Sequence, residues 1–195
     1  EELFDELCKK LKSRFEFTVE KATWLLGVHI KQGDGFVALS QLRYIEDMIK
    51  LDIFDGVKHR RTPLPVGLDL EKGEKKDKGD AFTVIFKKKI GVLLYLMLMT
   101  RPDVCFAVAY LARFGDCPTV EAMQAVDHLA GYVFSTKELM LVYTRASSPE
   151  FTAHPDASYA DCKYTGKSTV GHFVKKSGAA TSWYAGLGSV VALST

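Results

Sequence analysis

The spacing of hydrophobic residues changes once within the first forty residues, from helical to strand-like. Residues 1–15 place leucine, phenylalanine and cysteine at helical spacing, with acids leading and bases trailing, which suits the helix dipole. Residues 24–30 then form an apolar, strand-like run. The turn signal Gly-Asp-Gly at 33–35 follows, and residues 36–39 are apolar again. The pattern therefore predicts a helix followed by a β-hairpin.

Helical spacing returns after the hairpin. Ser40 is placed to cap a helix over residues 41–54, whose apolar side chains share one face. Three later helices are expected to bury one another's apolar faces: residues 86–99, residues 100–114 beginning at Thr100, and residues 119–134 beginning at Thr119.

Strand patterns dominate the rest of the chain. Four strands are predicted, over residues 139–143, 151–156, 169–175 and 180–183. The final stretch SVVALST (189–195) is typical of a strand or loop that ends at a helix cap. The predicted fold class is α+β: a β-hairpin and a helical bundle, followed by a partial antiparallel sheet.

Proline, glycine and dense alternating charge mark residues 56–80 as a linker. We expect this segment to be exposed and partly mobile. It includes the basic run KHRR at 58–61, and a second basic run, KKK, follows at 87–89. Either run could lie along a phosphate backbone, or it could simply be solvated; the solvated interpretation is favoured for the second run. In TRPD, Arg101 is expected to pair locally and Asp103 to cap the following helix.

Composition narrows the class of protein. The 195 residues are 47% hydrophobic and 26% charged, which is typical of a soluble globular domain with a sizeable core. The net charge of +2 neither demands nor excludes a nucleic-acid partner. Four cysteines and five histidines show no metal-binding spacing, so a structural zinc site is not expected. The cysteines are expected to be reduced thiols of an intracellular protein, located in the cytoplasm, the nucleus or virus-like particles. The most apolar run, residues 90–99, is about half the length that crosses a bilayer, so no membrane partner is expected.

Several stretches, in order, resemble the C-terminal part of copia-type LTR-retrotransposon Pol polyproteins. They are LLGVHI with SQLRYIEDMI, RTPLP, IGVLLYLMLMTRPDVCFAVAYLARFGDCPT, DASYAD, GKSTVGHF, and a tryptophan followed by VALST. The resemblance implies four segments: the reverse-transcriptase palm end with a primer-grip-like hairpin and first thumb helix (1–57), a charged linker (58–80), a helical thumb and connection region (81–137), and a partial RNase H-like sheet (138–195).

The resemblance also implies nucleic-acid contacts. A primer-grip hairpin and a thumb helix would hold an RNA–DNA hybrid or a DNA duplex by its shape and backbone. The alternative is that Trp24 and Tyr44 are core aromatics and Lys50 is a solvated charge. The candidate nucleic-acid-binding residues are Trp24, Gly27, His29 and Lys31 in the hairpin, Gln41, Arg43, Tyr44 and Lys50 in the helix, and Lys58, Arg60 and Arg61 in the linker.

The same family holds two Mg²⁺ ions with several carboxylates, and this chain lacks most of them. It contains no Asp-Asp pair, so the polymerase aspartates are missing. Asp156 matches the first catalytic aspartate of RNase H, but the next family acid would follow Thr195. Asp156 could then bind metal only if residues outside this chain completed the site. Otherwise it would form an Asx turn at a strand end. No cofactor is expected for the chain alone.

Two functional hypotheses follow, with accidental resemblance in an unrelated binding domain as a third. The chain is either an inactive Pol fragment that at most binds duplex, or a host-adopted interaction module that keeps the fold. Departures such as GYVFST at 131–136, where the family has a basic RYLKGT-like end, favour divergence. A partial sheet would also expose an open edge, so the rest of the polyprotein or a self-associating copy is an expected partner.

Overall fold

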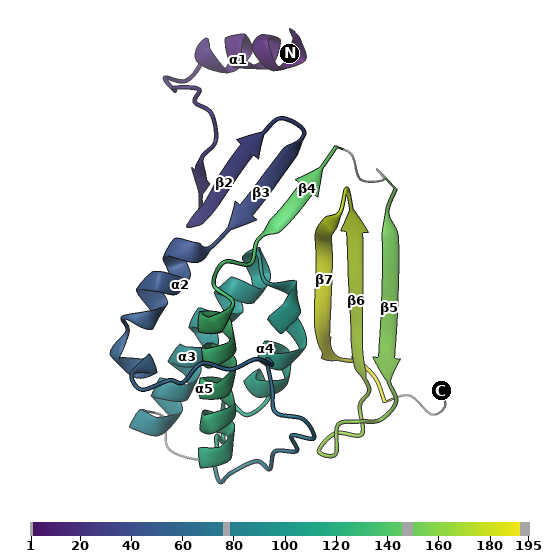
Figure 1. The fold of residues 1–195 in the computed structure, drawn as a ribbon. Coiled ribbons are helices and arrows are strands. Elements are labelled where there is room, and N and C mark those ends of the chain that lie inside the picture. The colour runs from purple at the N-terminus through teal and green to yellow at the C-terminus, as the bar shows by residue number, and fades with distance from the viewer. Residues whose placement is uncertain (1, 76–78, 146–149, 192–195) are drawn as a thin grey trace.

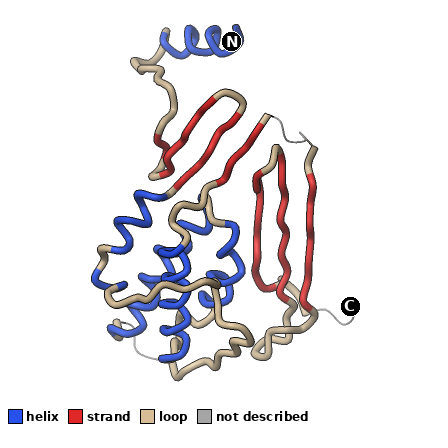
Figure 2. Tube along the Cα trace, viewed as in Figure 1, coloured by secondary structure: helices blue, strands red, loops and turns tan. Residues whose placement is uncertain are grey.

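The computed structural model describes residues 2–75, 79–145 and 150–191. These residues form five α-helices and two antiparallel sheets, which confirms the α+β class. Four helices pack together beneath a small sheet and beside a second one, whereas the N-terminal helix α1 (Glu2–Lys12) stands apart from them (Figure 1). Figure 2 shows how the helices and the two groups of strands separate in space.

The predicted hairpin is confirmed, and it belongs to a four-stranded sheet that we call the hairpin sheet. Gly35 has a φ of +74° in the tight turn, a backbone conformation that glycine adopts without strain. The fourth strand comes from about a hundred residues further along the chain. The order is β1 (Trp24–Leu25), β2 (Val28–Gly33), β3 (Phe36–Ser40) and β4 (Leu141–Thr144), each antiparallel to its neighbour.

Polar side chains cap α3 and α5, whereas α2 and α4 begin without a side-chain cap bond. The helix predicted to begin at Thr100 is wrong in its start, because Thr100 is the C-cap of α3 and the α-helix begins only at Cys105, after a 3₁₀ turn. The side chain of Asp80 accepts a hydrogen bond from Thr83 N at 2.9 Å, so α3 begins at Ala81 rather than at residue 86. In α2, the helix that precedes α3 along the chain, Gln41 and not Ser40 occupies the N-cap position. Ser40 Oγ nevertheless accepts a hydrogen bond from Leu42 N at 3.2 Å. The helix expected over 41–54 ends at Ile49 and resumes as a 3₁₀ turn. The bounds are α2 (Leu42–Ile49), the 3₁₀ turn η1 (Asp52–Phe54), α3 (Ala81–Met99), the 3₁₀ turn η2 (Pro102–Val104), α4 (Cys105–Ala112) and α5 (Val120–Ser135).

The helices α3, α4 and α5 surround the main hydrophobic core. Phe86, Leu93, Val108 and Leu129 are fully buried in it. Thr119 caps α5 as predicted, since its Oγ1 accepts from Ala122 N at 3.2 Å. None of the helices in the described ranges is both long and apolar enough to cross a membrane.

The C-terminal sheet contains β5 (Thr152–Ser158), β6 (Thr169–Lys176) and β7 (Ala179–Leu187), in that order. Trp183 Nε1 donates to the carbonyl oxygen of Met97 at 2.8 Å, which fixes β7 against the end of α3. Tyr143 Oη donates to the carbonyl oxygen of Ala180 at 2.6 Å and joins the two sheets. Residues 188–191 form no strand, and residues 192–195 of the expected final element lie outside the described residues.

The charged linker is largely exposed, as expected, but it is anchored at several points. Leu70 is buried in the core, and Arg60 N donates to the carbonyl oxygen of Gly131 at 3.2 Å. Lys163 forms ion pairs with Asp69 at 2.9 Å and with Glu71, which connects the β5–β6 loop to the linker. The hydrogen bond from Lys163 is the main reason why the pKa of the exposed Glu71 carboxyl is lowered.

Arg101 is the one arginine whose side chain is almost completely buried among the described residues, with a side-chain exposure of 1%. Its Nε and Nη2 donate to the two carboxylate oxygens of Asp103 at 2.9 and 2.7 Å, which confirms the predicted local pair. Nη2 also donates to Thr136 Oγ1 at 2.7 Å. Asp103 makes no helix cap, because its oxygens accept from Arg101 and from Tyr132 Oη instead.

A first prediction concerns the packing of the linker against α5. A Cβ added to Gly131 would lie 2.0 Å from the carbonyl oxygen of Lys58, so Gly131→Ala must displace the linker. We expect it to destabilise the fold by about 1–3 kcal/mol, although alanine normally stabilises a helix relative to glycine. Gly91→Ala is the matched control, because nothing lies within 4 Å of the added Cβ on α3. This control should gain about 0.5–1 kcal/mol in urea unfolding. Equal signs for the two variants would contradict the close packing.

A second prediction concerns the buried ion pair. Asp103→Ala leaves the Arg101 guanidinium without its carboxylate and should cost about 3 kcal/mol in the free energy of unfolding. That is the low end for a broken buried pair, since the Asp103 side chain is 30% exposed. Asp47→Ala removes the exposed pair with Lys50 and should change stability by less than about 1 kcal/mol. Similar losses for both variants in denaturant titrations would refute the special role of Arg101.

Candidate nucleic-acid interface

Three of the four candidate residues in the hairpin lie on one face of the hairpin sheet. Trp24 on β1 is directly opposite His29 on β2. Side chains alternate along a strand, so Lys31 lies on the same face as His29. Phe36 shares this face, because it pairs with Gly33 and its ring covers that glycine. The sequence analysis missed Phe36, although the register of the tight turn could have revealed it.

This surface, which we call the hairpin face, carries an aromatic pair beside a cation. The Trp24 and His29 rings are stacked with centroids 4.6 Å apart and an interplanar angle of 18°. Trp24 remains 48% exposed despite this contact, and Lys31 is exposed as well. An exposed indole can stack on a base, and a lysine can neutralise a phosphate. The interpretation of Trp24 as a core aromatic is therefore wrong.

The turn before β2 holds the fourth hairpin candidate, Gly27. Its φ is +74°, and the preceding Leu26 has a φ of +47°, which is unusual for a branched residue. Tyr95 Oη on α3 donates to the carbonyl oxygen of Leu26 and supports this turn. Gly27 thus provides backbone geometry that orients β1, and with it Trp24, on the hairpin face.

Only two of the four candidates around α2 reach the surface. Arg43 and Lys50 are exposed, and Lys50 pairs with Asp47 at 3.1 Å. Tyr44 is half-buried and donates to the carbonyl oxygen of Val92 at 3.3 Å; burial, together with the charge of nearby Tyr95, raises the pKa of its phenol. Gln41 is 1% exposed and accepts from Thr100 Oγ1 at 2.7 Å. The expectation that Gln41 faces a duplex is not met, and for Tyr44 the alternative of a core aromatic is the one that the structure supports. Both residues belong to the packing between the N-terminal end of α2 and α3.

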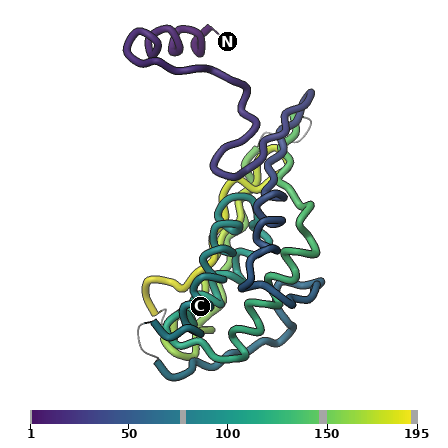
Figure 3. Tube along the Cα trace, turned by 90° about the vertical axis from the view of Figure 1, so that its left-hand side faces the viewer, coloured from purple at the N-terminus to yellow at the C-terminus, as the bar shows by residue number. Residues whose placement is uncertain are grey.

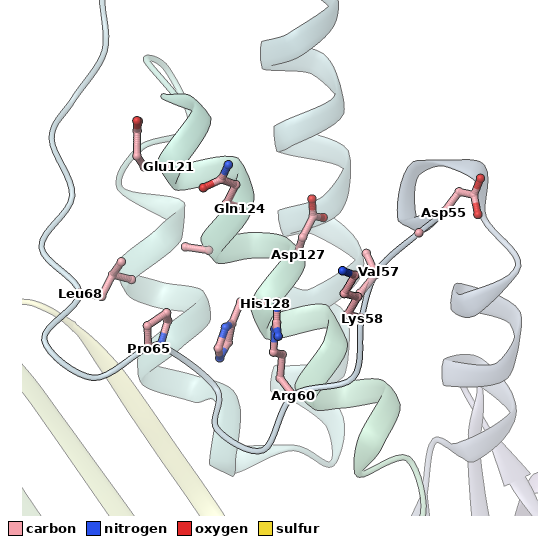
Figure 4. Close-up of a pocket in the computed structure, with 12 residues that line it drawn as sticks. Asp55, Val57, Lys58, Arg60, Pro65, Leu68, Glu121, Gln124, Asp127 and His128 are labelled. Atoms are coloured by element: carbon pink, nitrogen blue, oxygen red, sulfur yellow. The ribbon is translucent and has the colours of Figure 1, made fainter.

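The three linker candidates lie elsewhere, over α5. Lys58 and Arg60 line a surface pocket of about 590 Å³ (Figure 4), and Arg61 is exposed beside them. The same pocket is lined by Asp55, Glu121 and Asp127, so its charge is mixed rather than basic. This balance argues against a phosphate-binding groove at the linker.

His128 also lines this pocket, and burial lowers the pKa of its imidazole, which favours the neutral ring. The basic run at 87–89 is partly structural. Lys87 pairs with Asp116 at 2.9 Å, and the buried Lys89 pairs with Asp127 beneath the pocket. The two paired lysines are consequently poor phosphate ligands, which agrees with the favoured interpretation of that run.

Asp156 lies within β5, which continues to Ser158, so the strand-end Asx turn is wrong. It is exposed, and its Oδ1 accepts from Ala157 N at 2.9 Å. Asp161 could not assist it readily, because both of its carboxylate oxygens accept from Thr169, at 2.5 and 2.6 Å. In the part of the chain that the structure describes, no group of three or more metal-ligand side chains gathers. These donors do not fit a pair of Mg²⁺ ions, which needs several carboxylates around one site.

Comparison with known proteins relates the chain to mobile elements. The retrovirus-related Pol polyprotein from transposon TNT 1-94 of Nicotiana tabacum is 34% identical over 161 residues, which cover 80% of this chain and 12% of the polyprotein. The Pol polyprotein from transposon RE1 of Arabidopsis thaliana is 30% identical over 166 residues, covering 84% of this chain and 11% of that protein. No family model and no solved structure matches.

A third relative is much shorter. The secreted RxLR effector protein 161 of Plasmopara viticola is 33% identical over 112 residues, which cover 57% of this chain and 79% of the effector. The chain thus spans only a small part of the Pol polyproteins but most of this relative. The chain is therefore a retrotransposon-derived protein, homologous to a short part of these Pol polyproteins.

Proposed function

We propose that this chain is a non-catalytic piece or divergent copy of a retrotransposon Pol protein, running from the palm end of the reverse transcriptase to the first strands of RNase H. Three features support the assignment: the order of the sequence motifs, the homology to Pol polyproteins, and the position of Asp156 in the first strand of a C-terminal sheet. Its proposed activity is to hold an RNA–DNA hybrid or a DNA duplex.

The hairpin face is the observation that carries this proposal. It combines the exposed Trp24 ring, its stacking partner His29 and the exposed Lys31 on an antiparallel sheet. Stacking of the indole on the exposed terminal base of a duplex tolerates any sequence, and the lysine contact adds a salt-dependent term. Arg43 is a further exposed cation on helix α2, which follows β3 directly along the chain. The predicted binding is therefore weak, independent of sequence and sensitive to salt.

The chemistry of strand cleavage is not assigned to this chain. A metal pair would bind the attacking water and the leaving oxygen, and it requires carboxylates from several elements. Asp156 supplies one, and Asp161 is occupied by Thr169. The proposal is that the chain holds nucleic acid without cutting it.

A specific observation favours a second candidate function. The chain covers most of a curated protein that is named as a secreted effector rather than as a polymerase. A protein of this size can thus exist apart from a Pol polyprotein, which supports an adopted, non-enzymatic interaction module as the alternative. The two candidates differ in one measurable property, namely salt-sensitive binding of duplex by a stably folded chain.

The binding proposal predicts distinct effects for two substitutions, measured by fluorescence anisotropy with a labelled hybrid duplex at two salt concentrations. Trp24→Ala should weaken binding by about 1–3 kcal/mol, the range for losing one stacked base. Lys31→Gln should lower the slope of log affinity against log salt by about 0.9.

Matched controls separate these effects from general damage. Tyr159→Ala removes an aromatic ring that is also 48% exposed but lies in the β5–β6 loop, and Lys88→Gln removes an exposed lysine on α3. Both should bind like the wild type. Wild-type protein that shows a cooperative unfolding transition but no salt-sensitive binding would reject duplex binding and leave the interaction module.

The absence of cleavage is a separate prediction. Wild-type chain incubated with hybrid duplex and Mg²⁺ should give no products beyond those of the Asp156→Asn variant, because one carboxylate cannot hold a metal pair. Denaturing gel electrophoresis measures this directly. Robust cleavage by the wild type that disappears in Asp156→Asn would overturn the non-catalytic assignment, whereas equal traces in both preparations indicate a contaminating nuclease.

A further inference from the structure

Helix α1 presents an apolar stripe that the rest of the chain leaves uncovered. None of its residues is buried, and it projects from the body on an extended segment in both views (Figures 1 and 3). Leu3 is 83% exposed and Leu7 is 53% exposed. The stripe at helical spacing comprises Leu3, Phe4, Leu7 and Leu11, and Phe15 continues it just beyond the helix.

An uncovered helix of this length is not stable by itself. α1 has 11 residues, and isolated helices shorter than about 12–15 residues are marginal in water. Most helical stability in proteins comes from burying an apolar face. The exposed Glu6–Lys10 ion pair at 2.8 Å adds only a few tenths of a kcal/mol. A partner that covers the stripe would supply the missing stabilisation.

We propose that α1 docks against α1 of a second copy of this chain, with the two helices antiparallel. The charge distribution identifies the occupant, because α1 is complementary to itself. Its first half is acidic (Glu2, Asp5 and Glu6), and its second half is basic (Lys9, Lys10 and Lys12).

An antiparallel register centred on Leu7 pairs the three leucines of the stripe with one another and also matches opposite charges. Leu7 meets Leu7 of the second copy, and Leu3 meets Leu11. In the same register Glu2 lies opposite Lys12, and Asp5 lies opposite Lys9, so each acidic half faces a basic half. A parallel pair would place like charges together and align the two helix dipoles unfavourably.

The interface is small, so the dimer should depend on concentration. Two short helices bury less area than a standard stable interface, which places this contact in the weak class. Residues 13–23 separate α1 from β1, so the pairing of the two helices uses no residue of the hairpin face. The self-association is independent of the proposed duplex binding, and it would hold two hairpin faces in one particle.

Disulfide trapping tests the pairing and its direction. The half-exposed cysteines are first removed by Cys8→Ser and Cys117→Ser, and two chains of different tag size then carry Leu3→Cys or Leu11→Cys. Mild oxidation of the mixture should give the mixed dimer, with little homodimer of either chain. Homodimers of the Leu3→Cys chain, which a parallel pair predicts, or no cross-linked product at high concentration, would overturn the proposal.

Sedimentation equilibrium tests the stripe itself. Leu7→Asp should abolish the dimer while leaving the melting temperature of the body unchanged, because α1 buries none of its residues there. Val66→Asp is the control, since Val66 is an equally apolar and fully exposed position in the linker, and it should dimerise normally. A wild-type chain that stays monomeric, or a dimer that survives Leu7→Asp, rejects α1 as the docking surface.

Discussion

A buried arginine fixes where the hairpin sheet sits on the helices. Arg101 has lost its water shell and is stabilised only if Asp103 and Thr136 both bind it. Thr136 is the C-cap of α5, and the chain enters β4 shortly after it. The neighbouring Thr100 donates to Gln41, the residue between β3 and α2. Two adjacent residues therefore hold both connections between the hairpin sheet and the helical core, and the orientation of the hairpin face depends on them.

The residues that hold the fold together are therefore different from the exposed residues of the hairpin face that are available to a ligand. Buried polar groups such as Gln41 and Arg101 specify geometry, and they are unavailable to a ligand. The exposed groups on the hairpin face contribute little to the core, so they can vary without unfolding the protein. The mixed-charge pocket at the linker illustrates the difference, because Asp127 on its wall neutralises the buried Lys89 and serves packing rather than binding. A divergent copy could thus lose nucleic-acid contacts and keep its fold.

The sequence predicted local structure well where the signal was local. The Gly-Asp-Gly turn and its flanking apolar runs sufficed for the hairpin, and Thr119 sufficed for the start of α5. The sequence did not predict the features that depend on tertiary packing. The sequence left Tyr44 open between a duplex contact and a core aromatic, and only the contact with α3 shows that its ring faces inward. The joining of β4 to β3 is a long-range pairing that periodicity does not encode. Gly131 was interpreted as the loss of a basic residue, whereas the close approach of the linker requires its missing side chain.

The edge strand β5 and the helix α1 are both exposed, but they differ in how favourably water solvates them. The sequence predicted that the C-terminal sheet would be left partly uncovered. In the structure its apolar face packs on α3 and α4 through Trp183 and Ala185. Its edge strand β5 is exposed along its whole length, but Pro155 interrupts the row of backbone donors, which opposes the addition of another strand. α1 has no such protection, because its exposed side chains are large and apolar and their spacing forms one continuous stripe. Water can solvate the polar edge of β5 at little cost, whereas the stripe on α1 is stabilised only by another apolar surface. Among the described residues, the continuous uncovered apolar surface therefore lies at α1, and not at the C-terminal sheet where the sequence alone placed it.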